Sequence, residues 1–312
     1  MVRLYHHLTL LKCLLNNMSW LLVALLGHFA NAGAFVIDKI LLVGKMKYPL
    51  VYVFYINALG LLVLPVVPFL TIAGLPRSLW ITTAVAGATF TYALLAFFTA
   101  LKNAEASRVV PLVGAAVPIW TFVFAWMTLS ERLTAGETWG IGLLVLGAVL
   151  ISYERKGKAM RPSDALLGVI AGALFALSYT YTKVVFNELD FISGFVWIKV
   201  ASFTAVLPLL LVPGAVRRIL RPDKQTKPTS LFFIGQASGA LGFVMLNYAI
   251  ELAPRVTIVN ALQGVQYAFL FVLIVVIGKL SPRTLQENFT PRILAQKMLA
   301  LLFLGGGLLL VS

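Results

Sequence analysis

Apolar residues along the chain lie in long blocks, and short segments that carry most of the charges separate these blocks. Most blocks are about 17 to 23 residues long, which is the length that a helix needs to cross roughly 30 Å of hydrocarbon. They lack the regular polar face of an amphipathic helix. The pattern predicts ten membrane-spanning helices, near residues 20–37, 50–71, 79–100, 109–129, 136–152, 164–183, 191–213, 230–250, 256–278 and 293–312.

Composition agrees with a location in the membrane. Hydrophobic residues make up 60% of the chain and charged residues 12%, whereas soluble proteins are about 25% charged. We therefore expect an all-α integral membrane protein with the lipid bilayer as its partner. The net charge of +14 does not indicate nucleic acid binding, because lysines and arginines in short loops orient membrane helices. The single cysteine, Cys13, and three histidines without ligand spacing predict no disulfide, cofactor or metal site.

Four short segments recur later in the chain. Each offset is constant within a block and changes only across a loop, as expected for a duplication with loop insertions. The pairs are 29–39 with 173–183, 63–65 with 206–208, 104–114 with 253–263, and 144–147 with 302–305, at offsets of 144, 143, 149 and 158 residues.

The duplication predicts two repeats, residues 18–153 and 164–312, with five spans each. Because five is odd, the second repeat enters the membrane from the opposite side, which makes the repeats inverted. In transporters built this way, the substrate site lies near the midplane, where the two repeats meet.

The first residues allow more than one interpretation. We expect residues 1–17 to be an extension with little structure, because Met18 resembles a natural start. Residues 20–29 followed by Ala30-Asn31-Ala32 could be a signal peptide with a small-residue cleavage site. The counterpart of this region deep in the chain favours a membrane span instead.

Basic residues are divided unequally between the two sets of loops. The loops after odd-numbered spans hold eighteen. The N-terminus and the loops after even-numbered spans hold six, namely Arg3, Lys12, Arg77, Arg132, Lys183 and Arg255. Because cytoplasmic loops are enriched in lysine and arginine, this count predicts that both termini lie outside. Segments 156–161 and 222–228 should then face the cytoplasm. We expect the membrane to be the cell (inner) membrane of a prokaryote.

Two quoted segments carry a family resemblance. MSWLLVALLGHFANAGAFVIDK begins at Met18, and LSERLTAGETWGIGLLVLGAVLIS begins at Leu129. Together with the duplication, they resemble the EamA-type members of the drug/metabolite transporter superfamily over residues 18–312. The resemblance implies a secondary carrier for small metabolites, often an exporter of amino acids or related compounds. The second repeat has Gly278-Lys279-Leu280-Ser281 where the first has Glu131, so the resemblance gives Glu131 no role beyond capping or loop structure.

The ninth predicted span carries a polar stripe. Asn260, Gln263 and Tyr267 share one helical face, with Gln266 at its edge. At the offset of 149 residues, the first three coincide with the candidate helix-break or gating residues Pro111, Gly114 and Pro118. Buried amides need partners in lipid, and prolines free backbone carbonyls. Both stripes fit a polar cavity between the repeats. The alternative is that the amides join helices and the prolines only kink one.

Other polar side chains at mid-span depth are candidates for the substrate pathway, although any one of them could simply join two helices. Lys199 differs because it is ionisable and has no acid in its own span. An ionisable residue inside the membrane indicates function, unless its long stem carries the charge to the interface. These candidates are His28, Asn31, Asn57, Tyr92, Ser178, Tyr179, Lys199, Gln236 and Asn247.

None of the eleven acidic residues lies in the middle of a predicted span. Because a cation/proton antiporter usually needs a deep carboxylate, the sequence disfavours cationic drug efflux. It favours a secondary-active exporter of a small zwitterionic or anionic metabolite, such as an amino acid. Cationic drug efflux and a channel stay as alternatives. Nothing indicates an enzyme, because the chain has no nucleophile–base set, paired carboxylates or phosphate-binding loop.

Overall fold

The computed structural model describes residues 20–37, 48–69, 71–104, 106–153, 160–220, 230–280 and 291–311, and within these ranges the fold is all-helical. Every predicted apolar block coincides with helix. The helices are Trp20–Ile37, α2 (Pro49–Gly60), α3 (Trp80–Asn103), α4 (Ala106–Thr128), α5 (Ala135–Ser152), α6 (Pro162–Glu188), α7 (Phe191–Val206), α8 (Ala215–Leu220), α9 (Ser230–Leu252), α10 (Val256–Ala261), α11 (Gln263–Leu280) and α12 (Pro291–Val311).

Seven helical segments of the described part are long and apolar enough to cross a membrane. Parts of α4, α5 and α12 form shorter apolar helices, Leu112–Thr128, Ala135–Ile151 and Ala295–Val311. The protein is therefore an all-helical, multi-pass integral membrane protein, as predicted. The N-terminal extension 1–17 and segment 222–228 lie outside the described residues, as does most of segment 156–161.

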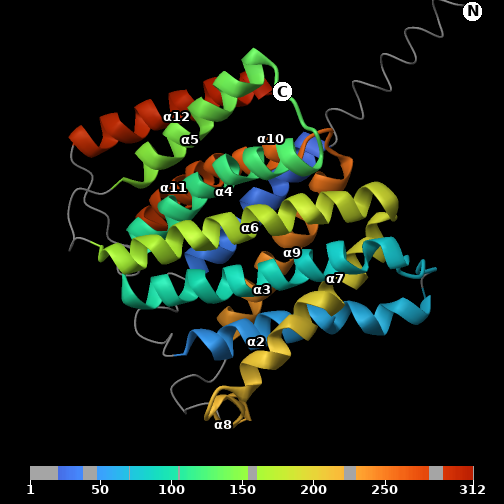
Figure 1. Ribbon diagram of the computed structural model, residues 1–312. Coiled ribbons are helices and arrows are strands. Elements are labelled where there is room, and N and C mark those ends of the chain that lie inside the picture. Colours follow the sequence, from blue (N-terminus) through green and yellow to red (C-terminus); the bar gives the residue numbers. More distant parts are fainter. Residues whose placement is uncertain are drawn as a thin grey trace, which may run out of the picture.

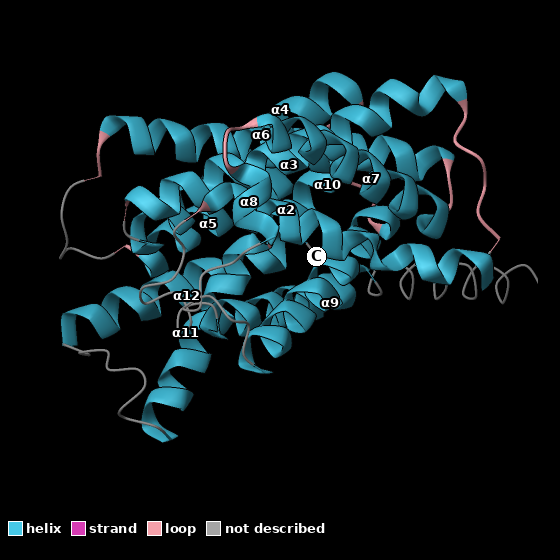
Figure 2. Cartoon of the chain, turned by 90° about the horizontal axis from the view of Figure 1, so that it is seen from below, coloured by secondary structure: helices cyan, strands magenta, loops and turns pink. Residues whose placement is uncertain are grey.

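The helices lie side by side in a bundle, with α5 and α12 at one edge and α2 and α8 at the opposite edge (Figure 1). Between these edges, α6 packs along both α3 and α4, and α3 also packs along α7. The view from below shows helices and loops but no strand in the described part (Figure 2). The arrangement places α3, α6 and α7 in the middle of the bundle.

Small residues permit the closest contacts between helices, as expected in a membrane. On α5, an added Cβ at Gly140 would lie 2.7 Å from Val311, and one at Gly147 would lie 2.7 Å from Leu304. The helix Trp20–Ile37 uses the same device against α9, where an added Cβ at Gly27 would lie 3.0 Å from Leu246. Gly140 and Gly147 of α5 thus serve packing against α12.

Two helices tighten into 3-10 turns next to prolines. Beyond α2, the 3-10 segment Leu61–Phe69 contains Pro65 and Pro68, and beyond α7 the 3-10 segment Leu207–Leu211 contains Pro208. Proline cannot donate the backbone hydrogen bond of a regular α-helix, so these turns follow from the sequence. Pro65 and Pro208 occupy matching positions in the recurring segments found in the sequence.

Candidate functional site

Lys199 of α7 points its ammonium group into a set of phenyl rings. Its Nζ lies 3.7 Å from the ring centroid of Phe243, 5.0 Å from that of Phe90 and 5.2 Å from that of Phe195. These rings come from α9, α3 and α7, and we call them the phenylalanine cage. The face of an aromatic ring attracts a cation, and the attraction grows when water is excluded.

The cage is held by further aromatic contacts. Phe243 packs against Phe90 with ring centroids 5.1 Å apart, and Phe90 packs against Phe175 of α6 at 5.9 Å. Gly60, at the end of α2, leaves room for the stem of Lys199, since an added Cβ there would lie 3.2 Å from Lys199 Cδ. The ammonium therefore rests among aromatic rings from three helices.

Within the described residues, the ammonium of Lys199 has neither an ion pair nor a hydrogen bond. An ammonium carries three hydrogen-bond donors. The ring faces stabilise its positive charge in part, but they provide no carboxylate or carbonyl oxygen to accept its hydrogen bonds. Lys199 is therefore able to bind an anionic group if one reaches the cage.

The polar stripe of the ninth predicted span faces α4. Asn260 Nδ2 donates to Thr121 Oγ1 at 3.0 Å, and the Tyr267 hydroxyl donates to the Val110 carbonyl at 3.0 Å. Gly114 makes room for Tyr267, because an added Cβ there would overlap the tyrosine hydroxyl. The two stripes that match in sequence thus meet in space, and these two side chains link the first half of the chain to the second.

Helix α4 runs as one helix through Pro111, Gly114 and Pro118, although the sequence singled these residues out as candidate helix breaks. Pro118 is buried, and the side chain of Pro111 lies outside the described part. The interruption falls instead in the opposite segment, where Leu262 separates α10 from α11. Gln263, half-buried, is the first residue after this interruption.

His28 and Gln266 join the N-terminal helix to α11. His28 Nδ1 lies 3.1 Å from Gln266 Oε1, and both side chains are buried. The other ring nitrogen of His28 has no hydrogen-bond partner among the described residues. One turn further, the half-buried Asn31 lies against the backbone of Gly242 on α9.

Three buried polar candidates bond to neighbouring backbone or side chains. Asn57 Nδ2 donates to the Val53 carbonyl at 2.9 Å, and its Oδ1 accepts from Thr91 at 3.1 Å. Ser178 donates to the Ala86 carbonyl at 2.8 Å. Asn247 donates to Phe243, four residues earlier, at 2.8 Å. The bonds of Asn57 to Thr91 and of Ser178 to Ala86 join helices, whereas the bond of Asn247 stays within α9.

Three further candidates differ in exposure. Gln236 lies partly buried at the contact between α9 and α2, and its amide donates to the Tyr52 hydroxyl at 3.1 Å. Tyr179 stacks on Phe175, with ring centroids 6.1 Å apart, in the middle of the bundle. Tyr92 is exposed. The structure thus gathers Lys199 with aromatic side chains and leaves Tyr92 apart.

A charged cluster at the turn between α9 and α10 was not foreseen from the sequence. Lys183 Nζ donates to the carbonyls of Glu251 and Ala253 at 2.8 and 2.7 Å. The buried carboxylate of Glu131 accepts from Val256 N at 2.8 Å and from the Thr257 hydroxyl at 2.7 Å. Lysine therefore meets the end of α9, and glutamate meets the start of α10, as the helix dipoles favour.

The turn between α4 and α5 positions Glu131 for this contact. Ser130 adopts a positive φ of 54°, and Glu131 N donates back to the Ala125 carbonyl at 3.2 Å, which closes the end of α4. Thr134 and Glu137 then form a capping box that begins α5. Glu137 also pairs with Arg255. A Thr-x-x-Glu pattern in the sequence indicates the capping box, but not these partners.

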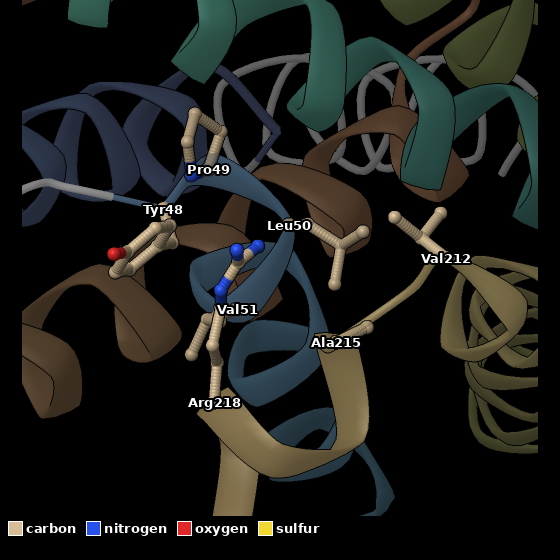
Figure 3. A pocket seen from close by; sticks show the side chains of 7 residues that line it. All are labelled: Tyr48, Pro49, Leu50, Val51, Val212, Ala215 and Arg218. Carbon is tan, nitrogen blue, oxygen red and sulfur yellow. The ribbon is translucent and has the colours of Figure 1, made fainter.

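A shallow apolar hollow lies elsewhere, between the start of α2 and α8. Figure 3 shows Leu50 and Val212 lining it, with the Arg218 guanidinium beside the Tyr48 ring at 4.6 Å from the centroid. None of the predicted pathway residues lines this hollow. Within the described residues, no group of three histidine, cysteine or acidic side chains could hold a metal ion.

Comparison with known proteins gives a shared fold and a family match over part of the chain. A search among curated sequences found no significant match. One solved structure, titled only as the crystal structure of a protein, matches 95% of this chain and 98% of its own, with a TM-score of 0.65 and 15% identity. At that identity the likeness shows a shared fold alone. The model of the EamA-like transporter family matches residues 18–153, which include both segments that carried the resemblance. This match confirms the resemblance over residues 18–153 and indicates a membrane transporter.

Proposed function

We propose that this protein is a secondary-active carrier that exports a small zwitterionic or anionic metabolite by alternating access. The observation that carries the proposal is the ammonium of Lys199, which lies inside the helical bundle without an anionic partner among the described residues. In a medium of low dielectric constant, such a charge attracts a carboxylate or phosphate far more strongly than in water. A cationic drug would be repelled from the same place.

Matching contacts in the two halves support an inverted repeat of ten spans. Gly172 of α6 packs against Ala116 of α4. At the sequence offsets of 144 and 149 residues, these positions correspond to His28 and Val265, and His28 contacts Gln266, the neighbour of Val265. Each contact thus joins the first span of one half to the fourth span of the other, as expected of two repeats related by a two-fold axis. The match between Pro65 and Pro208 adds a second pair.

The two halves would move against each other along the contact between α4 and the α10–α11 segment. Asn260, Gln263 and Tyr267 lie on one side of this contact, and Gly114 lies on the other. Because Asn260 and Tyr267 bond across it in this structure, rearrangement of these bonds would accompany transport. The interruption at Leu262 provides a point where the helix can bend.

An uptake screen in proteoliposomes tests the proposal. Purified protein is offered amino acids, organic acids and phosphorylated metabolites, and we expect saturable uptake that an internal pool of the same compound accelerates. Such counter-transport is the property of a carrier, whereas a channel gives flux that does not saturate and is not accelerated. Uptake confined to organic cations would contradict the proposal.

Lys199 variants then test the site with a matched pair of substrates, an amino acid and its amide. Lys199→Met keeps most of the stem and removes the charge, so the half-saturation concentration of the acid should rise about 10- to 100-fold. The amide should change much less. Lys199→Arg keeps the charge in another shape and should retain partial activity. Equal losses for acid and amide would rule out a direct contact between Lys199 and the carboxylate.

A further inference from the structure

The phenylalanine cage holds an ammonium group in this structure, and that group is the chain's own Lys199. Three ring centroids lie within 3.7 to 5.2 Å of one nitrogen, and the rings belong to three different helices. Aromatic cages recognise free ammonium ligands through the same attraction between a cation and ring faces. The cage therefore has the chemistry to accept an ammonium from elsewhere once Lys199 leaves.

We infer that the transported compound is a zwitterion whose ammonium replaces that of Lys199 in the phenylalanine cage. The inference rests on the proposed function, in which Lys199 binds the carboxylate of the substrate. Attraction between two opposite full charges in a dry site exceeds the attraction of a cation to ring faces. An arriving carboxylate would draw the Lys199 ammonium out of the cage on its flexible stem. The ammonium of the substrate, a few bonds from its carboxylate, would then enter the vacated space.

This exchange gives the site a selectivity that Lys199 alone would not have. A simple anion pairs with Lys199 but leaves the cage empty of charge. A simple cation meets the fixed charge of Lys199 before it reaches the rings. Only a compound with both groups satisfies Lys199 and the cage together, and Phe90, Phe195 and Phe243 thereby become residues that determine specificity.

A chemical rescue experiment tests whether the cage binds a free ammonium. Lys199→Ala removes three methylene groups and the nitrogen, which together correspond to propylammonium. We expect propylammonium to raise the melting temperature of purified Lys199→Ala in a concentration-dependent way, and to leave the wild-type melting temperature unchanged. The neutral isostere propan-1-ol should have much less effect. The double variant Lys199→Ala/Phe243→Leu, which keeps apolar volume but loses one ring face, should lose the response.

A binding measurement on other variants covers the case in which Lys199→Ala does not fold. Leucine and 4-methylpentanoate differ only in the ammonium, so calorimetry with both probes isolates the contribution of the cage. Phe243→Leu should weaken leucine binding about tenfold and leave 4-methylpentanoate unchanged. Lys199→Met should weaken both.

Failure of this inference can be told apart from failure of the proposed function. Equal effects of propylammonium and propan-1-ol, or equal effects of Phe243→Leu on both acids, would overturn the ammonium site, as would wild-type protein that binds 4-methylpentanoate but not leucine. Saturable uptake with counter-transport would still support the carrier. Absence of all saturable uptake would overturn the proposed function, even if propylammonium bound to the cage.

Discussion

Lys183 and Lys199 both place an ammonium between helices, but their surroundings are opposite. Lys183 donates to two backbone carbonyls at the end of α9, at 2.8 and 2.7 Å. Lys199 faces three phenyl rings, and within the described residues it has no hydrogen bond or ion pair. One lysine has its acceptors built into the fold, and the other retains unused donors.

The difference separates a lysine with a structural role from one that we propose to be functional. The last carbonyls of a helix lack partners within the helix, and a lysine from a neighbouring helix can satisfy them and favour the negative end of the dipole. Lys183 does this for α9, so its role is complete without a ligand. Lys199 completes no helix end. What distinguishes the two lysines is which acceptors surround each nitrogen.

The largest effect on stability should come from Lys183→Met. The substitution leaves the carbonyls of Glu251 and Ala253 without their donor and removes the positive charge beside the buried Glu131. We expect the free energy of unfolding in detergent to fall by about 3 kcal/mol. Lys199→Met is the matched control, and it should change the same quantity by less than about 1 kcal/mol, because methionine sulfur also packs well against aromatic rings. Similar losses in both variants would remove the distinction between the two lysines.

A smaller effect is expected from Glu131→Gln, which tests the acidic half of the same turn. Glutamine has one acceptor oxygen, whereas the carboxylate accepts from both Val256 N and the Thr257 hydroxyl with its two oxygens. The substitution thus weakens the hydrogen bond of one of these two donors and removes the negative charge, which should lower the unfolding free energy by about 1 to 3 kcal/mol. Transport by the folded fraction should keep its half-saturation concentration. A change in that concentration without loss of stability would instead give Glu131 a direct part in transport.

The sequence predicted the helices well because lipid imposes a simple requirement on them. A spanning helix must be long and apolar, so hydropathy alone marks the helices from Trp20–Ile37 to α12, except the short α8, which lies between two predicted blocks. The turn before α5 was also readable, since Thr134 and Glu137 have the spacing of a capping box. The interruption at Leu262 was not readable, because neither proline nor glycine occupies that position.

The surroundings of the site could not be predicted in the same way. Lys199 was identified because a charge within an apolar span is unusual. Its cage was missed, since Phe90, Phe195 and Phe243 look like ordinary apolar residues until three helices bring them together. Lys183 was counted as a loop residue that orients a helix, although it lies inside α6. Its partners are backbone carbonyls, which no sequence pattern reveals.

The smallest effect should come from Arg255→Met, at the more exposed side of the charged turn. The Arg255 side chain is 29% exposed and that of Glu137 is 14% exposed. Water screens such a pair, so its loss should cost less than about 1 kcal/mol of unfolding free energy. The capping box does not depend on Arg255, because Thr134 still accepts from Glu137 N and Glu137 still accepts from Thr134 N.

Raising the salt concentration should remove most of the difference in stability between Arg255→Met and the wild type, and it should leave the loss caused by Lys183→Met nearly unchanged. If Arg255→Met destabilised the protein as much as Lys183→Met, the stability of this turn would come from the ion pair, and the hydrogen bonds of Lys183 to the end of α9 would not be its main support.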